Sequence, residues 1–463
     1  MIFFWIYIAA AFLITLYCLN QFYLLILSFK KKSYPPFNPL FLPKVAIQLP
    51  VYNEKLVIQR LIESTIDLEY PKQLLEIQIL DDSNDETSQI CAQLTTFYRS
   101  KGWNIQHLKR NSREGFKAGA LEYGLQFIDS QFIAIFDADF IPPFDFLKKT
   151  IGFFDNPQIG VVQSAWSHLN ENYSLLTKVQ AFQLNIHFAV EQKGRFQGNY
   201  FSQFNGTAGV WRKNAIIDAG GWQKDTLTED LDLSIRTQLK GWKIIQFTDL
   251  KSPAELPYKW EDFKNQQFRW IKGGTECWFK LIQRILLNDF KISKKIQAIF
   301  QLSGSLVYIL ILLMAISSLG LLLTPRLIYP YFFYFFQMGI FSLFFVYALP
   351  WIKEKGISLN FFLRYTFFLI FTTGISLSNS KAVLLGLFKI STPFTRTPKY
   401  GLNPLITLRK IKPALVELIF GLIFSYAFIF GLTTKNYDFL MFHFLLSIAY
   451  LISFYFSVHP KHN

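Results

Sequence analysis

The sequence is poor in cysteine, with only Cys18, Cys91 and Cys277 among 463 residues. No two of them have the spacing of a disulfide or metal-binding pair. This scarcity argues against a disulfide framework and against a zinc site. It fits a reducing compartment such as the cytoplasm.

Negative charge is also in short supply, because 32 Asp and Glu residues face 47 Lys and Arg residues, a formal net charge of +15. A basic chain can bind nucleic acid, but no nucleic-acid-binding module is recognisable. The cations instead cluster beside apolar segments, at Lys30–Lys32 and Lys294–Lys295. This positive-inside pattern predicts membrane lipids rather than nucleic acid as partners, with the region between those segments in the cytoplasm.

The N-terminal segment has no charged side chain between Met1 and Ser28. It lacks the charged n-region and the small-residue cleavage site of a secretory signal. Residues 1–29 are therefore expected to form a transmembrane helix, an uncleaved anchor whose N-terminus lies outside.

Long apolar runs are absent from residues 44–290 and return in the C-terminal region, 296–458. Four stretches there have about the 20 residues that a bilayer requires, namely 297–323, 328–349, 414–433 and 437–457. With the N-terminal anchor they make five expected crossings. This predicts a multi-pass protein of a bacterial-type inner or plasma membrane.

Segment 361–389 is apolar but carries Arg364 and Lys381, and it leads to the basic loop 396–400. A full crossing would place that loop outside, against the positive-inside trend. We therefore expect an interfacial or re-entrant helix here. The basic loop itself is expected to contact either the mouth of an active site or lipid phosphates.

Residues 44–290 have the pattern of a soluble α/β domain. Strand-like runs lie at 44–49, 75–80, 105–108, 132–136 and 160–163. Helical patterns such as 54–68 and 115–127 lie between them. This alternation predicts a mostly parallel, doubly wound sheet, inserted between transmembrane helices. Such sheets bind ligands beyond the carboxyl ends of their strands.

Asp137 and Asp139 follow the strand-like run 132–136 directly. In an extended chain residues i and i+2 face the same way, so both carboxylates converge just past a strand end. Mg²⁺ and Mn²⁺ take one or two carboxylates together with phosphate oxygens. The pair predicts a divalent metal that neutralises a leaving diphosphate, with two solvated turn acids as the alternative.

Asp82 stands with Asp81 at a second strand end, after Leu80. A carboxylate at this place can accept hydrogen bonds from the ribose or base of a nucleotide. The alternative is a turn that caps the next helix, opened by Asp85–Thr87. The two roles are compatible, and we expect Asp82 in a nucleotide site.

Thr228, Glu229 and Asp230 have the pattern of a helix start, where acidic side chains suit the helix dipole. Taken alone, the segment is best explained as such a cap. In context Asp230 is the candidate general base, because glycosyl transfer with inversion needs one carboxylate to take the proton of the attacking hydroxyl. Glu229 is expected beside it on the acceptor side.

Gln266, Arg269 and Trp270 form an aromatic and basic block on one expected helix. Trp stacks on the apolar face of a sugar ring, and Arg pairs with diphosphate. The alternative is an amphipathic helix that docks on the membrane surface.

Three smaller features complete the candidate site. Lys117 is a second possible contact to phosphate or nucleotide. Asn205 and Gly206 begin a stretch of small residues that lets the backbone approach an acceptor.

Together these motifs resemble the signature of processive family-two glycosyltransferases, the relatives of cellulose, chitin and hyaluronan synthases. The motifs are Asp82, Asp137-x-Asp139, Thr228-Glu229-Asp230 and Gln266-Gln267-x-Arg269-Trp270. Four further stretches, 204–212, 219–222, 239–243 and 255–257, are similar to the plant cellulose-synthase-like mannan and glucan synthases.

The resemblance implies a GT-A domain that extends a β-linked glycan from UDP-glucose or GDP-mannose with Mg²⁺ or Mn²⁺. It implies that Asp82 and Asp137 contact the nucleotide diphosphate, that Asp139 holds the metal and that Asp230 is the base. The residues implied at the border between donor diphosphate and acceptor sugar are Gln266, Arg269 and Trp270.

Two alternatives stay open at this point. One is transfer of a single sugar to a lipid acceptor, as in enzymes similar to ceramide glucosyltransferases. The other is a catalytically inactive membrane scaffold or transporter, which the complete set of acids disfavours.

Overall fold

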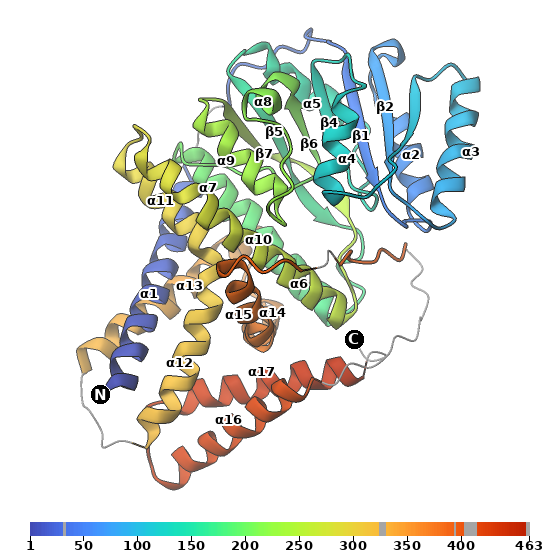
Figure 1. Ribbon diagram of the computed structural model, residues 1–463. Coiled ribbons are helices and arrows are strands. Elements are labelled where there is room, and N and C mark those ends of the chain that lie inside the picture. Colours follow the sequence, from blue (N-terminus) through green and yellow to red (C-terminus); the bar gives the residue numbers. More distant parts are fainter. Residues whose placement is uncertain (31–33, 324–329, 393–394, 402–413, 460–463) are drawn as a thin grey trace.

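The computed structural model describes residues 1–30, 34–323, 330–392, 395–401 and 414–459. A sheet domain lies at one end, and long helices extend from it to a second, all-helical region (Figure 1). Among the predicted features, Lys31, Lys32 and the first two residues of the span 328–349 lie outside the described residues.

The sheet has seven strands in the order β3-β2-β1-β4-β6-β5-β7. Their bounds are β1 Val45–Val51, β2 Leu75–Asp81, β3 Ile105–Lys109, β4 Phe132–Ile135, β5 Ile159–His168, β6 Gly209–Arg212 and β7 Lys243–Ala254. All neighbouring pairs are parallel except those of β6, which runs antiparallel to β4 and to β5. The predicted, mostly parallel sheet is confirmed.

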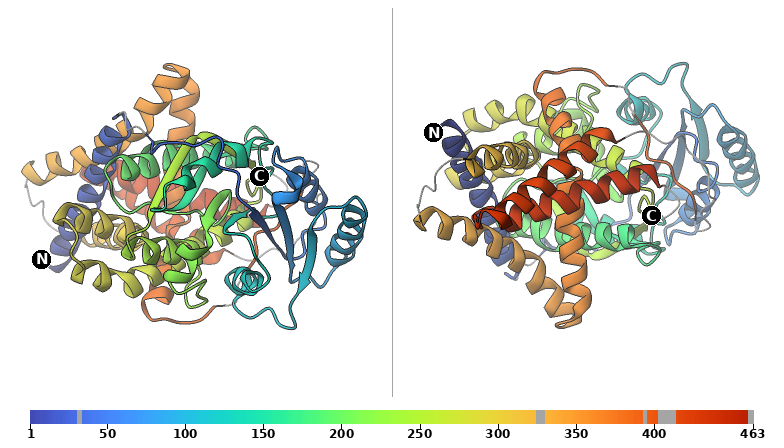
Figure 2. Two further views of the ribbon diagram at one scale, coloured as in Figure 1. Left: turned by 90° about the horizontal axis from the view of Figure 1, so that it is seen from above. Right: turned by 90° about the horizontal axis from the view of Figure 1, so that it is seen from below.

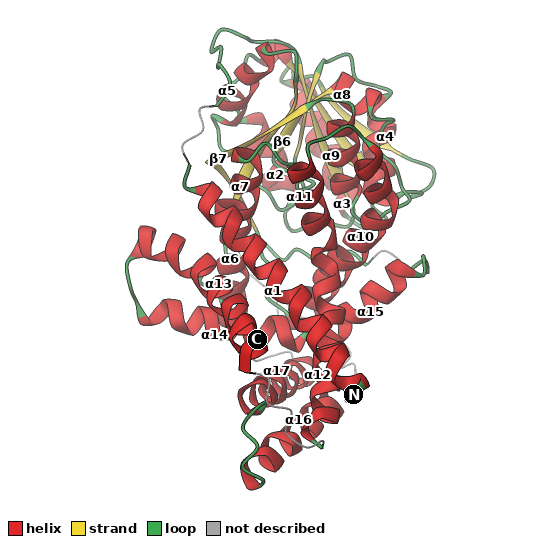
Figure 3. Ribbon diagram, turned by 90° about the vertical axis from the view of Figure 1, so that its left-hand side faces the viewer, coloured by secondary structure: helices red, strands yellow, loops and turns green. Residues whose placement is uncertain are grey.

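Helices cover both faces of the sheet, which is why its central strands are apolar on both sides (Figure 3). One face packs against α2 (Ile58–Ile66) and α3 (Thr87–Ser100). The other packs against α4 (Phe116–Leu125), α8 (Lys213–Asp218) and α9 (Glu229–Leu239). Within β1, Ile47 faces the first core and Ala46 the second.

The five strand-like runs and both helical patterns of the sequence are present as β1 to β5, α2 and α4. Strands β6 and β7 were not predicted. β6 is only four residues long, and the small residues before it have the pattern of a loop. It joins the two parallel parts of the sheet and so carries the chain segment 204–208 to the carboxyl end of β4.

A layer of helices lies beneath the sheet domain. It contains α6 (Leu175–Ile186), the π-helix η3 (His187–Gln192), α7 (Lys193–Gln197) and α10 (Trp260–Leu287). Apolar side chains of α6 and α10 share one core with the membrane-type helices α13 (Pro330–Lys355) and α14 (Leu359–Gly374). The sheet domain is therefore packed onto the helical region, not tethered to it.

Shorter elements connect these layers. They are η1 Lys72–Leu74, α5 Phe146–Thr150, η2 Ile151–Asp155, α11 Ile292–Ser303, η4 Gly304–Leu306 and α15 Ser376–Leu387.

Five helical segments of the described chain are long and apolar enough to cross a membrane. They are Ile2–Ser28 (α1), Ile292–Leu322 (ending in α12, Val307–Leu322), Phe335–Lys355 in α13, Leu415–Thr433 (α16) and Leu440–Val458 (α17). Helices α16 and α17 lie side by side on the side away from the sheet domain (Figure 2).

The predicted interfacial segment 361–389 corresponds to α14 and α15, which are bent by 49° at Ile375. Such a bend is found in a broken span or a re-entrant loop. Arg364, whose charge motivated that prediction, is buried and forms an ion pair with Glu171 of the sheet domain at 2.7 Å.

Candidate active site

A cavity of about 250 Å³ opens at the carboxyl ends of β1, β2 and β4. All eleven candidate site residues line it: Asp82, Lys117, Asp137, Asp139, Asn205, Gly206, Glu229, Asp230, Gln266, Arg269 and Trp270. The sheet edge, α9 and α10 thus bring together motifs that are far apart in the sequence.

Asp137 and Asp139 follow β4 and are each paired with a lysine. Lys117 Nζ lies 2.5 Å from Asp137 Oδ1, and it also donates to the Gly206 carbonyl at 2.8 Å. Asp139 is 3% exposed, and its Oδ2 accepts from Lys399 Nζ at 2.7 Å. Helix α4 supplies one lysine, and the chain after α15 supplies the other.

The donor set of this pair fits a hard divalent cation. Burial, which is only partly offset by the charge of Lys399, raises the pKa of Asp139. A buried carboxylate in this position needs positive charge beside it, and a metal ion supplies the same neutralisation as the two ammonium groups. Asp137 and Asp139 are therefore the residues that would hold Mg²⁺ or Mn²⁺.

Asp230 lies in the first turn of α9, as predicted for a helix start. Gly206 faces it with a φ of +82°, a conformation that suits glycine, and a Cβ there would lie 3.2 Å from Asp230 Oδ2. Burial and the neighbouring charge of Glu229 raise the pKa of Asp230 to about 7, although Lys117 opposes the shift. The carboxylate thus has the protonation equilibrium of a base that works near neutral pH.

Lys117 connects the two acidic clusters. Burial disfavours its charge, but the carboxylates of Asp137, Glu229 and Asp230 outweigh that effect and raise its pKa. The ammonium group is therefore charged at neutral pH and lies where a diphosphate would need positive charge.

Asp82 lies at the outer part of the cavity in an ion pair with Arg110, whose Nε donates to Asp82 Oδ1 at 2.9 Å. Nearby, the Arg113 guanidinium stacks 3.3 Å from the centre of the Tyr52 ring. A flat cation on an aromatic ring, next to a carboxylate, is an arrangement suited to a nucleoside.

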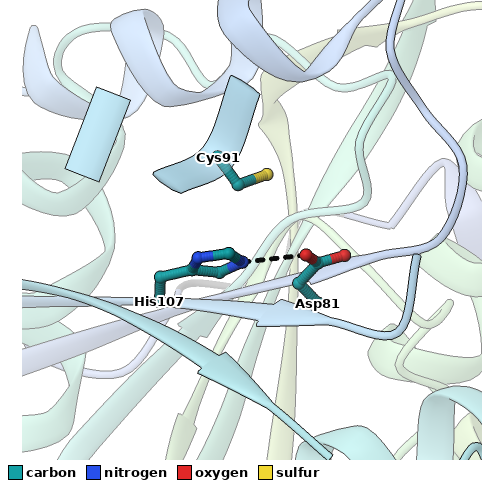
Figure 4. A group of neighbouring side chains, drawn as sticks. All are labelled: Asp81, Cys91 and His107. Carbon is teal, nitrogen blue, oxygen red and sulfur yellow. Dashed lines mark hydrogen bonds and ion pairs between the residues drawn. The ribbon is translucent and has the colours of Figure 1, made fainter. Parts of the chain in front are cut away.

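The side chain of Asp81 does not line the cavity, although Asp81 is adjacent to Asp82. Figure 4 shows it with Cys91 and His107, the one group of three possible metal-binding side chains among the described residues. His107 Nε2 lies 2.8 Å from Asp81 Oδ2. Burial raises the pKa of the Cys91 thiol to about 12, so the thiolate that a metal requires is disfavoured. This hydrogen bond connects β2 to β3.

Gln266, Arg269 and Trp270 lie on α10, which confirms the predicted helix. This helix passes under the cavity, so the block contributes to the wall of the site. The membrane-surface helix considered as an alternative does not describe these three residues.

The basic loop after α15 lies at the mouth of the cavity, the first of its two expected places. Arg396 Nη1 lies 2.6 Å from Glu54 Oε1, and Tyr400 Oη donates to Asp262 Oδ2 at 2.7 Å. With the Lys399–Asp139 pair, these contacts tie described residues 395–401 across the site.

Sequence reasoning missed Glu54, Trp166 and His168, which also line the cavity. Burial raises the pKa of Glu54 to about 7 despite Arg396. His168 ends β5 at the site, and both its ring nitrogens are buried without a partner among the described residues. Strand-end position was the signal that could have identified it.

Known proteins share this domain. Residues 47–220 match the family described as Glycosyl transferase family 2. The chain is 41% identical over 264 residues to the "probable glucomannan 4-beta-mannosyltransferase 7" of Oryza sativa subsp. japonica, which covers 56% of this chain and 45% of the relative. It is 40% identical over 264 residues to the similarly named protein 15 of Arabidopsis thaliana, covering 56% and 49%.

Residues 47–220 are thus similar to family 2 glycosyl transferases, and the wider chain is similar to these plant proteins. Its fold is similar to that of the mannosyltransferase PcManGT from Pyrobaculum calidifontis, solved with GDP-Man and Mn²⁺, with a TM-score of 0.61 and 17% identity over 83% of this chain and 99% of that one. The resemblance and the GT-A fold predicted from the sequence are confirmed. The chain spans about half the length of its curated plant relatives.

Proposed function

We propose that this protein is a membrane-embedded, inverting hexosyltransferase that moves mannose from GDP-mannose to the end of a β-linked glycan. The observation that carries the proposal is Asp230, a half-buried carboxylate whose raised pKa suits a general base, in a cavity that also holds a carboxylate pair and a Trp. The plant relatives, named as mannosyltransferases, favour mannose over the glucose of UDP-glucose.

The geometry supports a division of roles. Asp230 takes the proton of the acceptor hydroxyl as that oxygen attacks the anomeric carbon of the donor sugar. Trp270 offers an aromatic face for a sugar ring, and Arg269 and Lys117 supply positive charge for the diphosphate. Asp82, aligned by Arg110, faces the nucleoside end.

Asp137 and Asp139 would hold Mg²⁺ or Mn²⁺, which neutralises the diphosphate leaving group when bound. Lys399 pairs with Asp139 and Lys117 with Asp137, so the carboxylates stay compensated before the donor binds. Asp137 and Asp139 can therefore stay ionised in the cavity before the donor and the metal bind.

The same proposal places the sheet domain in the cytoplasm and the apolar helices across a plasma membrane. Lys294 and Lys295 at the start of one apolar segment, and Lys353 and Lys355 at the end of another, support this orientation. The bent pair α14 and α15 is proposed to stay at the cytoplasmic interface, which leaves five crossings.

The test uses full-length protein in nanodiscs with Mn²⁺ or Mg²⁺. Radiolabelled GDP-mannose, UDP-glucose and UDP-N-acetylglucosamine are supplied separately, and products are sized before and after digestion with β-mannanase or β-glucanase. We expect a long, β-mannanase-sensitive product from GDP-mannose. A long β-glucanase-sensitive product would identify UDP-glucose as donor.

Two results would contradict the proposal. A single labelled sugar on an extractable lipid would make the protein a glycolipid synthase. No turnover of any donor by wild-type protein that binds GDP would support an inactive scaffold.

A further inference from the structure

One helical run beneath the site contains an irregular turn. Between α6 and α7, residues His187–Gln192 form a π-helix, a wider turn that recurs at functional sites. Its side chains face the cavity wall on one side and the N-terminal helix α1 on the other. None of its residues lines the cavity itself.

Gln192, which is fully buried, determines how Asn205 is oriented. Its Nε2 donates to the Gln203 carbonyl at 3.0 Å and to Asn205 Oδ1 at 3.2 Å. A backbone carbonyl only accepts, so this end of the Gln192 amide must be the nitrogen. The atom of Asn205 that faces it must therefore be the oxygen.

His187 provides the second contact to the same oxygen, with Nε2 at 3.3 Å from Asn205 Oδ1. Its other ring nitrogen lies 3.0 Å from Glu191 Oε2, so the ring is held from both sides. With its oxygen engaged twice, Asn205 must direct its Nδ2 elsewhere. That atom is buried and has no hydrogen-bond partner among the described residues, although Asn205 lines the cavity next to Gly206 and Asp230.

The π-helix also supports a second side chain of the cavity wall. The Phe188 ring packs against Trp166, with 5.4 Å between ring centres. The indole nitrogen of Trp166 is likewise buried without a partner among the described residues. Two donors at one wall of the cavity, both backed by the same turn, match a sugar that offers hydroxyl oxygens.

Helix α1 fixes the turn from behind. A Cβ on Gly194 would lie 2.4 Å from the Leu24 carbonyl oxygen, so the two helices touch at their backbones. Glu191 joins the two ends of the turn, because it accepts from His187 and from Arg195 Nη2 at 3.2 Å. The membrane anchor is therefore in contact with the support of the active site.

We propose that His187 and Gln192 are positioning residues that hold the Asn205 amide with its Nδ2 directed at a hydroxyl oxygen of the acceptor sugar. The inference rests on the proposed transfer to a glycan. The π-helical turn would then orient the acceptor beside Asp230. Helix α1 would support this turn from the other side.

The experiment measures binding of a β-1,4-linked manno-oligosaccharide to full-length protein in detergent, with saturating GDP and Mn²⁺. Asn205→Asp keeps the shape and both accepted bonds but removes the Nδ2 donor. Gln192→Glu removes the donor that orients Asn205. Each is expected to weaken oligosaccharide binding by about ten-fold or more, the effect of one lost hydrogen bond to a buried partner, while GDP affinity stays at the wild-type value.

Gln180→Glu is the matched control. Gln180 is a buried glutamine of α6 whose Nε2 also donates to a carbonyl, that of Pro257, at 2.7 Å. The same substitution there tests for general damage from a buried carboxylate, and oligosaccharide binding should stay within about two-fold of wild type. The double variant Asn205→Asp with Gln192→Glu should bind no more weakly than the weaker single variant, because both remove one contact.

The outcomes separate the two proposals. Wild-type protein that binds the oligosaccharide but transfers no mannose would overturn the proposed function and leave the positioning role intact. Wild-type affinity in the Gln192→Glu variant, or an equal loss in Gln180→Glu, would overturn the positioning role. Reduced GDP affinity with unchanged oligosaccharide binding would place Asn205 on the donor side and also overturn it.

Discussion

The cavity has two sides that are built in different ways. On the sheet side, the pairs are close in sequence: Lys117 and Asp137 are 20 residues apart, and Asp82 and Arg110 are 28 apart. On the membrane side, Lys399 reaches Asp139 across 260 residues. The sheet side is thus specified within one folding unit, whereas the membrane side exists only after the C-terminal helices have packed.

The difference shows that the two sides of the cavity depend on different parts of the fold. In the proposed function, the sheet side binds the nucleotide and the diphosphate. The membrane side consists of the loop 395–401 and the wall backed by η3, which depend on packing of the apolar helices. Four experiments can break or sharpen this comparison.

The largest effect is expected from Asp230→Asn, at the junction of the two sides. Loss of the base should lower the rate of transfer by about 10²- to 10⁴-fold, the usual contribution of general base catalysis. The affinity for GDP should stay close to the wild-type value, because Asn keeps the shape of the side chain and Lys117 remains paired with Asp137. Rates come from labelled product, and affinity from calorimetry.

Asp225→Asn provides the matched control. This aspartate lies five residues earlier, is exposed and pairs with Lys280. Its rate of transfer should equal that of wild type. An Asp230→Asn variant that loses GDP affinity would show that Asp230 belongs to the donor site and not to the reaction.

The second experiment, Lys399→Met, removes the ion pair between Lys399 and Asp139. Without metal, Asp139 is left buried and unpaired, so the variant should lose about 3–5 kcal/mol of stability. With saturating Mn²⁺ the gap in melting temperature should close, because a divalent cation on Asp139 replaces the ammonium. Lys148→Met, which breaks the exposed pair with Glu69, should change neither melting curve.

If the gap persists unchanged in Mn²⁺, the metal does not bind at Asp139. Equal stability of wild type and Lys399→Met without metal would show that the loop does not hold Asp139 in solution. In either case the membrane side of the cavity would not contribute to the neutralisation of Asp139.

The sequence alone predicts the sheet side of this site better than the membrane side. The strands β1 to β5, the start of α9 and the acids at strand ends follow from local patterns of apolar and acidic residues. Lys399 has no local signal for function, since it reaches the cavity only through packing of a distant segment. His168 has only its position at the end of β5 as a signal. β6 was missed because four residues beside a glycine-rich loop carry little strand pattern.

The third experiment is the pH profile of transfer. Because burial and Glu229 raise the pKa of Asp230 to about 7, the base is protonated below that pH. The value of kcat/KM should rise about ten-fold per pH unit up to pH 7 and then level off. A flat profile between pH 5 and 7 would mean that a carboxylate with an ordinary pKa accepts the proton.

The smallest effects compare two groups at strand ends in acid. Burial lowers the pKa of His168, at the end of β5, from 6.5 to about 4. At the end of β2, burial of Asp81 favours its neutral form, but hydrogen bonds from His107 and Ser83 prevail and lower its pKa to about 2. In both cases the unfolded chain binds the proton more tightly, so stability is lost as the pH falls.

The pH windows differ. The contribution of His168, about 3 kcal/mol, is complete above pH 6.5 and disappears as the pH falls to about 4. That of Asp81, about 2 kcal/mol, disappears only below pH 3.8. His168→Gln, which stays neutral, should therefore flatten the loss of melting temperature between pH 6.5 and 4 and leave the loss below pH 3.8 unchanged. Identical curves for wild type and variant would mean that His168 is solvated, and then the end of β5 would be open to water where the end of β2 is closed.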